Sequence, residues 1–146
     1  MRRSPLLVAL ALLASCGDST GPNVTLANLT GTWVLTGYEL QEVGNPANHL
    51  SFYDQGLRGT IVIQADGQFS FQVTAPGEDP QTLDGVLQIS GDSLFYSEAT
   101  GYQSKFRVSL AGSTMHWAEL ESQSEEDLDG DGNLEDVITI LDWRRQ

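Results

Sequence analysis

The residues with the clearest capacity for chemistry are gathered in one short acidic segment, residues 127–136. Side chains with oxygen atoms recur at alternate positions through most of this segment, and Gly132 permits a sharp turn within it. Calcium takes six to eight oxygen ligands, and alternate residues of a tight loop can direct several carboxylates to one point. The sequence therefore predicts a structural calcium site with the candidate ligands Asp127, Asp129, Asp131, Asn133, Glu135 and Asp136.

The spacing of this segment is similar to the first nine positions of an EF-hand loop, with Gly132 at position six. Position twelve, a bidentate glutamate in an EF-hand, is Ile138, and its neighbours are β-branched residues typical of strands. The segment instead resembles the calcium loops between strands of β-propellers and other extracellular repeats. Its crowded carboxylates favour a cation, because each like-charge pair at about 4 Å costs about 1 kcal/mol even in water. A solvated turn without a metal is the alternative, since Asp, Asn and Gly form turns readily.

Signals for catalysis are otherwise scarce. The chain has one cysteine and two histidines, and it lacks a glycine-rich phosphate loop. His116 and Asp142, facing each other across the final hairpin, form the one acid–base pair that the sequence can place. A surface or packing role for the histidine is the more ordinary interpretation. We therefore expect no enzymatic activity and assign no catalytic residue.

The N-terminal segment has the three parts of a secretory signal: Arg2 and Arg3, an apolar stretch over residues 6–14, and small residues at a cleavage point. This stretch is far too short for a membrane-spanning helix, which needs about 20 residues. The run Leu-Ala-Ser-Cys that ends at Cys16 resembles the bacterial lipobox, which implies removal of residues 1–15 and acylation of the cysteine. More than one acyl chain gives stable membrane anchoring. An ordinary signal peptide that contains a cysteine is the alternative.

Two further features suggest a place and a set of partners for the mature chain. Gly17 follows the cysteine, and the lipobox resemblance then implies the outer membrane of a bacterial envelope, on its periplasmic or surface face. Loss of residues 1–15 leaves five basic against 20 acidic residues, a net charge of −15. That charge argues against nucleic acid and anionic lipid surfaces as partners, since both are bound by clustered lysine and arginine. We expect residues 16–28 to form a lipidated tether and residues 29–146 to form one domain.

From residue 29 onward, short stretches of alternating apolar and polar residues are separated by turn residues, which indicates β-strands. Dipeptides such as Asp66-Gly67 predict tight hairpin links between neighbours. Residues 43–59 are the exception, a long connection with room for a short helix over residues 47–53. Eight short strands linked by hairpins indicate an all-β antiparallel barrel, with a β-sandwich as the alternative. The expected strands cover residues 32–42, 60–64, 68–74, 82–90, 93–98, 103–110, 114–121 and 137–144.

The first expected strand opens with Gly31-Thr32-Trp33, which resembles the Gly-x-Trp signature of lipocalins and related calycins. The resemblance implies an eight-stranded up-and-down barrel in which Trp33 plugs the closed end and an arginine of the last strand packs over it. Arg144 is the matching position, with Arg145 as the second choice. A planar guanidinium can stack on an indole while donating to nearby carbonyls. Gly31, Trp33 and Arg144 are therefore the expected barrel-closing motif.

An eight-stranded barrel either fills its interior with side chains or holds one small ligand. We therefore expect a membrane-anchored, lipocalin-like lipoprotein that binds a small apolar ligand in or near its barrel. The alternative is an envelope protein-interaction module, such as an inhibitor or assembly factor, with a filled barrel. The apolar pattern does not separate inward from outward positions in the last strand. Side chains expected to line or fill the interior are Tyr38, Phe69, Phe71, Phe95, Tyr96, Phe106 and Trp117.

Overall fold

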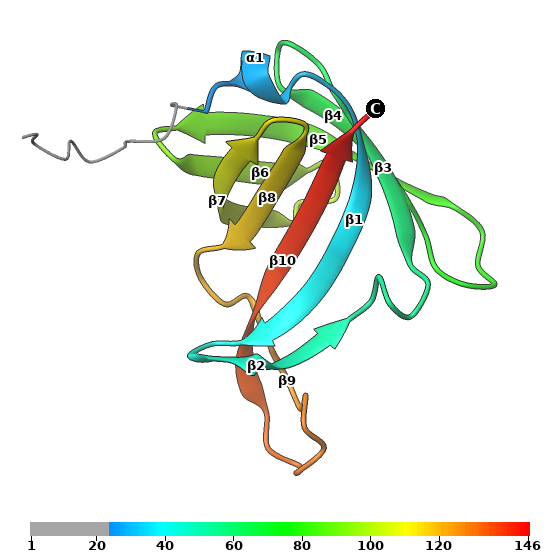
Figure 1. The fold of residues 1–146 in the computed structure, drawn as a ribbon, viewed down its shortest axis with the longest axis vertical. Coiled ribbons are helices and arrows are strands. Elements are labelled where there is room, and N and C mark those ends of the chain that lie inside the picture. Colours follow the sequence, from blue (N-terminus) through cyan, green and yellow to red (C-terminus); the bar gives the residue numbers. More distant parts are fainter. Residues whose placement is uncertain (1–23) are drawn as a thin grey trace, which may run out of the picture.

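Ten strands and one short helix account for most of the computed structural model, which describes residues 24–146 (Figure 1). The elements are α1 (Leu26–Leu29), β1 (Gly31–Glu42), β2 (Asn45–Ser51), β3 (Arg58–Ile63), β4 (Gln68–Thr74), β5 (Gln81–Ser90), β6 (Ser93–Glu98), β7 (Gln103–Ala111), β8 (Thr114–Glu119), β9 (Ser124–Glu126) and β10 (Glu135–Arg145). All the strands belong to one sheet, in the order β2-β1-β3-β4-β5-β6-β7-β8-β10-β9. The expected signal peptide and the cysteine at its end, Cys16, lie outside the described residues.

The sheet closes into a barrel because β1 also pairs with β10, from Trp33 opposite Arg145 to Glu42 opposite Val137. The 12 residues of β1 give it a second edge long enough to pair first with β3 and then with β2. In the same way, β10 pairs with β8 and then with β9. Eight of the described strands thus form the wall, and β2 and β9 extend it at the end away from α1 (Figure 1). The expected antiparallel eight-stranded barrel is confirmed, and the β-sandwich alternative is wrong.

Residues 43–59 contain β2 and turns rather than the helix expected over residues 47–53. Pairing of β2 with β1 gives hydrogen-bond partners to backbone groups of β1 that lie beyond the end of β3. This pairing is a long-range property of the barrel, so the local sequence does not reveal it. The sequence did not predict β9 either, because its three residues are all polar and exposed and show no apolar alternation.

Side chains alternate between the barrel interior and the outer surface along most strands, as expected for pleated sheet. On β4, Phe69 and Phe71 are buried while the residues next to them are exposed. On β10, Leu141 and Trp143 are buried and belong to the core cluster inside the barrel, so this face of the strand is the inward one, a point that the sequence did not determine. Phe95 was wrongly expected in the interior: it lies on the outer face of β6 and is 40 % exposed.

A bulge in β1 changes which of its side chains reach the interior. The pairing of β1 with β10 shifts register between Leu35 and Gly37. Strict alternation would place Leu35 and Gly37 on the same inner face. The extra residue, Thr36, moves the alternation by one position, so that Tyr38 faces inward opposite Leu141. The bulge therefore puts a tyrosine, rather than a glycine, inside the barrel.

Helix α1 covers the end of the barrel near the start of β1 (Figure 1). Thr25 caps the helix, since its hydroxyl accepts a hydrogen bond from the backbone N–H of Asn28 at 3.3 Å. Leu29 is fully buried, and its carbonyl oxygen accepts from the indole Nε1 of Trp33 at 2.7 Å. Val24 also packs into the core. Residues 24–28, which were expected in the tether, are therefore part of the domain.

Arg145 closes this end of the barrel over Trp33. Its guanidinium carbon lies 4.3 Å from the centroid of the Trp33 ring, and the group donates to the carbonyl oxygens of Asn28 and Thr30. Arg144 was expected first in this role, but the structure places Arg145 over the ring. Arg145 stands directly opposite Trp33 in the β1–β10 pairing, whereas the preceding residue must point to the other face of the sheet.

Candidate functional site

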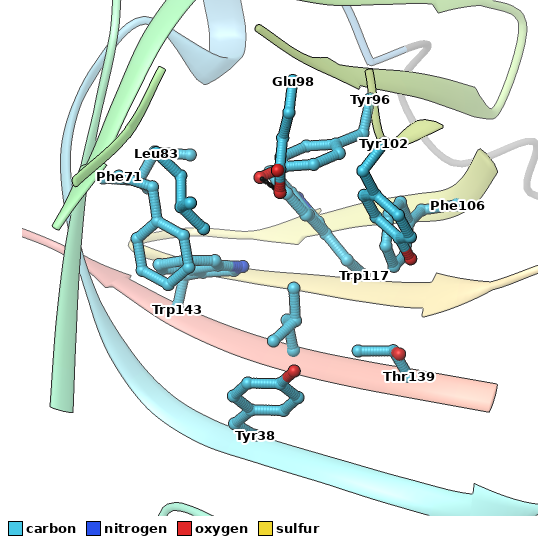
Figure 2. Close-up of a pocket in the computed structure, with 12 residues that line it drawn as sticks. Tyr38, Phe71, Leu83, Tyr96, Glu98, Tyr102, Phe106, Trp117, Thr139 and Trp143 are labelled. Carbon is cyan, nitrogen blue, oxygen red and sulfur yellow. Dashed lines mark hydrogen bonds between the residues drawn. The ribbon is translucent and has the colours of Figure 1, made fainter. Parts of the chain in front are cut away.

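A cavity of about 140 Å³ lies inside the barrel, toward the end opposite α1. Its lining grades from the fully buried Ile61 and Trp117 to Tyr102, which is 45 % exposed. The exposed members show that the cavity communicates with solvent at one end, which we call the mouth. All eight strands of the wall or the turns beside them contribute side chains, and the lining residues are Tyr38, Ile61, Phe71, Leu83, Tyr96, Glu98, Tyr102, Phe106, Trp117, Thr139, Leu141 and Trp143 (Figure 2).

Aromatic rings wall the inner part of the cavity. The ring centroids of Trp117 and Trp143 are 5.4 Å apart, and Phe71 stands edge-on to Trp143 with the same centroid separation. Phe106 lies 5.7 Å from Trp117 on the other side. Tilted and edge-on pairs of this kind attract one another beyond the area they bury, so the wall is a stable apolar surface.

The two tryptophans of this wall each carry a buried polar atom without a protein partner. The Nε1 atoms of Trp117 and Trp143 are buried and make no hydrogen bond within the described part of the chain. Figure 2 shows the Nε1 of Trp143 directed toward the middle of the cavity. Most buried donors in proteins have an acceptor, so these two stand out.

Glu98 supplies a carboxylate at the side of the cavity. Its Oε1 accepts a hydrogen bond from the Tyr96 hydroxyl at 2.8 Å, and its Oε2 accepts from the Thr100 hydroxyl at 2.7 Å. Burial and the hydrogen bond to Glu98 raise the pKa of Tyr96 far above its ordinary value. The phenol therefore stays protonated and holds the carboxylate in place across the ordinary pH range.

A second carboxylate, that of Glu119, is buried beside the mouth. It follows Trp117 by two positions on β8, so the strand turns both side chains inward. The hydroxyl of Ser104 and the backbone N–H of Thr139, the latter at 2.9 Å, donate to its two oxygens. Burial, and then the charge of Glu119, raise the pKa of Tyr102. The mouth is thus rich in acceptors and in protonated phenols.

The charge around the cavity is of one sign. The described residues that line it include the acidic Glu98 and no lysine, arginine or histidine. The whole chain carries a net charge of −13. An anionic group would enter this cavity without a counter-charge, which is unfavourable in a partly buried site.

Five of the side chains expected in the interior do line the cavity: Tyr38, Phe71, Tyr96, Phe106 and Trp117. Phe69 is buried and stacks on Tyr96, with ring centroids 4.7 Å apart, but does not line the cavity. Sequence reasoning missed Glu98, Tyr102, Glu119 and Trp143. Counting every second residue from Trp117 would have placed Glu119 inside, but a carboxylate is not expected there from polarity alone.

The acidic loop between β9 and β10 brings together three of the six expected calcium ligands. Oxygen atoms of Asp127, Asp129 and Glu135 lie within 4.8 Å of one another. Asp131 and Asp136 do not join this group. The carboxylate of Asp131 instead accepts hydrogen bonds from Asn133, which lower its pKa. The three clustered carboxylates could provide part of a calcium coordination shell.

Backbone N–H groups of the same loop also bond to these carboxylates. Asp127 accepts from Gly130 at 2.7 Å and from Gly132 at 3.0 Å. Glu135 accepts from the N–H of Leu128 at 3.1 Å, which links the two sides of the loop. Hydrogen bonds of this type are typical of turns that contain Asp and Asn. The geometry is therefore compatible with both interpretations drawn from the sequence, the metal site and the solvated turn.

The expected juxtaposition of His116 with Asp142 is confirmed, with Nδ1 and Oδ1 2.7 Å apart. The two residues stand opposite each other on the neighbouring strands β8 and β10, and both side chains are 48 % exposed. Their strand positions alternate with the inward-facing Trp117 and Trp143, so they lie on the outer surface of the barrel. The pair is thus separated from the cavity by the wall.

No protein-family model matches this chain, and no curated protein compared with it matches either. Across residues 24–146, no helix is both long and apolar enough to cross a membrane.

Proposed function

We propose that this protein binds a small, largely apolar ligand inside its barrel and has no catalytic role. The observation that carries the proposal is the aromatic cavity, which joins a fully buried wall to a partly exposed mouth. An apolar cavity of about 150 Å³ can hold one benzene molecule, whereas pockets for drug-sized ligands have about 300–1,000 Å³. The cavity volume of about 140 Å³ therefore favours a ligand, or a ligand end, of about one ring.

Titration with benzene, followed by tryptophan fluorescence, tests the proposal directly, because Trp117 and Trp143 form the cavity wall. Leu83→Phe should weaken binding by about tenfold or more, since the larger side chain takes space at the cavity. Val86→Phe is the matched control: it lies on the same strand but faces outward and is 41 % exposed. Absence of benzene binding to the wild type, or equal binding by Leu83→Phe and Val86→Phe, would count against the cavity as a binding site.

The small volume also favours the second candidate, an envelope interaction module such as an inhibitor or assembly factor whose barrel interior is filled. Solvent extraction of the protein purified from its own membranes, followed by mass spectrometry, separates the two. An apolar compound recovered at a stoichiometric amount supports ligand binding. No compound in the extract, together with no benzene binding, supports the interaction module.

The proposal includes a lipid anchor and a place in the cell envelope. The lipobox-like run ending at Cys16, and the Gly31 and Trp33 signature at the closed end, support a lipocalin-like lipoprotein of the outer membrane. Metabolic labelling with a fatty-acid analogue should mark the wild type and leave Cys16→Ser unmarked. An unlabelled wild type would refute the anchor.

We also propose that the acidic loop binds calcium and so holds β9 and β10 in register. The support is the cluster that Asp127 and Asp129, in the loop that joins the two strands, form with Glu135, the first residue of β10. Sites of extracellular modules bind calcium at about 10⁻⁴–10⁻³ M, and calorimetry should find an affinity in that range. The double variant Asp127→Asn with Asp129→Asn should abolish the heat of calcium binding. The control is Asp79→Asn, which changes an exposed acidic residue of another loop and should leave that heat unchanged. Equal binding by the double variant and the wild type would refute the site.

A further inference from the structure

The two unpartnered indole groups of the cavity constrain the chemistry of its ligand. Trp117 is 0 % exposed and Trp143 is 1 % exposed, and both line the cavity. The Nε1 of each is buried without an acceptor in the described chain. An indole N–H can only donate a hydrogen bond. A molecule that satisfies these N–H groups must therefore bring an acceptor atom into the cavity.

The third tryptophan shows that this arrangement is not a general property of the fold. Trp33 is just as deeply buried, but its Nε1 donates to the carbonyl oxygen of Leu29 at 2.7 Å. The closed end of the barrel thus provides an acceptor for its indole, and the cavity end does not. A difference of this kind is expected where a ligand supplies the missing partner, because buried donors are rarely left unpaired.

The charges at the cavity exclude one class of acceptor. A carboxylate or phosphate on the ligand would accept well from an indole, but it would lie near the carboxylates of Glu98 and Glu119. No basic side chain among the described lining residues would balance it. The acceptor must therefore be an uncharged oxygen or nitrogen, as in a ketone, an ester or an ether.

Resting on the proposed binding function, we propose that the ligand is an uncharged molecule of about one ring, with an acceptor atom that receives a hydrogen bond from the indole N–H of Trp143 or of Trp117. Specificity then arises from the wall of the cavity. A pure hydrocarbon leaves the indoles unpaired, and an anion such as a free fatty acid meets uncompensated negative charge. Of two molecules with the same shape, the cavity should bind the one with an uncharged acceptor atom more tightly than the one without it.

Three probes with the same six-membered carbon ring test this inference: cyclohexanone, methylenecyclohexane and cyclohexanecarboxylate, of which the first two are nearly equal in size. Only the first is a neutral molecule with an acceptor oxygen, and the second replaces that oxygen with a CH₂ group. The measurement is the ¹H–¹⁵N spectrum of the full chain, in which the three indole groups give separate signals. Cyclohexanone should shift the Nε1–H signal of Trp117 or Trp143 downfield, as a new hydrogen bond forms. The signal of Trp33, which already has its acceptor, is the internal control.

Each outcome has a distinct meaning. A downfield shift with cyclohexanone alone, and binding of cyclohexanecarboxylate that is about tenfold or more weaker, supports the inference. Binding of cyclohexanone without any shift of the two cavity indoles overturns it and leaves the binding function in place. Saturable binding of methylenecyclohexane that shifts the same two signals equally also overturns it. No binding of any probe, or of benzene, is a failure of the proposed function itself. Leu83→Phe should reduce every shift that arises within the cavity.

Discussion

Replacing Arg145 by alanine should destabilise the closed end of the barrel, whereas the same change at Arg144 should have little effect. The Arg145 guanidinium covers one face of Trp33 and donates to the carbonyl oxygens of Asn28, in α1, and of Thr30, which joins α1 to β1. Arg144 is exposed, sits one position away on the same strand, and makes none of these contacts. The two variants remove the same side chain and the same charge, so the difference between them measures the contacts alone.

The expected size of the effect follows from those contacts. A cation over an aromatic ring at a partly exposed site contributes about 0.5–1 kcal/mol. Two hydrogen bonds contribute about 0.5–1 kcal/mol each, at the low end of the usual range because water competes for the exposed guanidinium. The sum is about 2 kcal/mol for Arg145→Ala, against less than about 0.5 kcal/mol for a surface change such as Arg144→Ala. For a domain of this size, 2 kcal/mol lowers the Tm by about 8 °C.

Urea unfolding followed by tryptophan fluorescence provides the assay, with a thermal melt as an independent measurement. For Arg145→Ala, the urea concentration at the midpoint of unfolding should fall. The dependence of the free energy of unfolding on urea concentration should not change, since the same surface is exposed on unfolding. Arg145→Lys should recover only part of the loss, because an ammonium cannot stack and donate in the same planar manner. If the two alanine variants unfold within about 0.5 kcal/mol of each other, the closed-end argument is wrong.

Three further predictions concern the core and its titration. Gly67→Ala should cost more stability than Gly91→Ala, although both glycines have positive φ. A Cβ at position 67 would clash with the carbonyl oxygen of Leu87, whereas a Cβ at position 91 would meet open space. Equal thermal melts of the two variants would contradict this. Glu119→Ala should lower the free energy of unfolding by about 2–4 kcal/mol, since it leaves buried donors without an acceptor, and Glu119→Gln should cost less in the same urea assay. Burial and a hydrogen bond raise the pKa of Tyr96, so above pH 10 the unfolded chain releases a proton that the folded chain retains, and stability should fall as pH rises. Tyr96→Phe should show a shallower loss between pH 9 and 11, and an identical loss would show that this phenol is not a source of the pH dependence.

The strands were predictable wherever local alternation determines them. Residues 68–74 and 93–98 were expected with the bounds that β4 and β6 have, because apolar and polar residues alternate between clear turns. β2 was not predictable, since it exists to pair with the second half of β1 and has no clear alternation of its own. The bulge at Thr36 was equally hidden, because it depends on how β1 meets β10, more than 100 residues later.

The cavity was predictable in outline and not in its polar detail. Aromatic residues at alternate positions indicated an aromatic interior, and most of them are there. Glu119 was overlooked because acidic residues are rarely buried, and its burial depends on donors from Ser104 and Thr139 on other strands. In the same way, no local feature distinguishes the paired indole of Trp33 from the unpaired indole of Trp143. The presence of an acceptor is a property of the neighbouring strand or helix, not of the tryptophan.

The position of α1 has a consequence for the orientation of the whole molecule. The described chain begins beside the closed end, where α1, Trp33 and Arg145 meet, and the mouth of the cavity is at the other end. If Cys16 is acylated as proposed, it lies eight positions before Val24, and this stretch of chain spans at most about 28 Å. The membrane would then hold the barrel by its sealed base, with the mouth and the acidic loop turned toward the aqueous side. A ligand would enter from the surrounding solution rather than directly from the lipid layer to which the protein is attached.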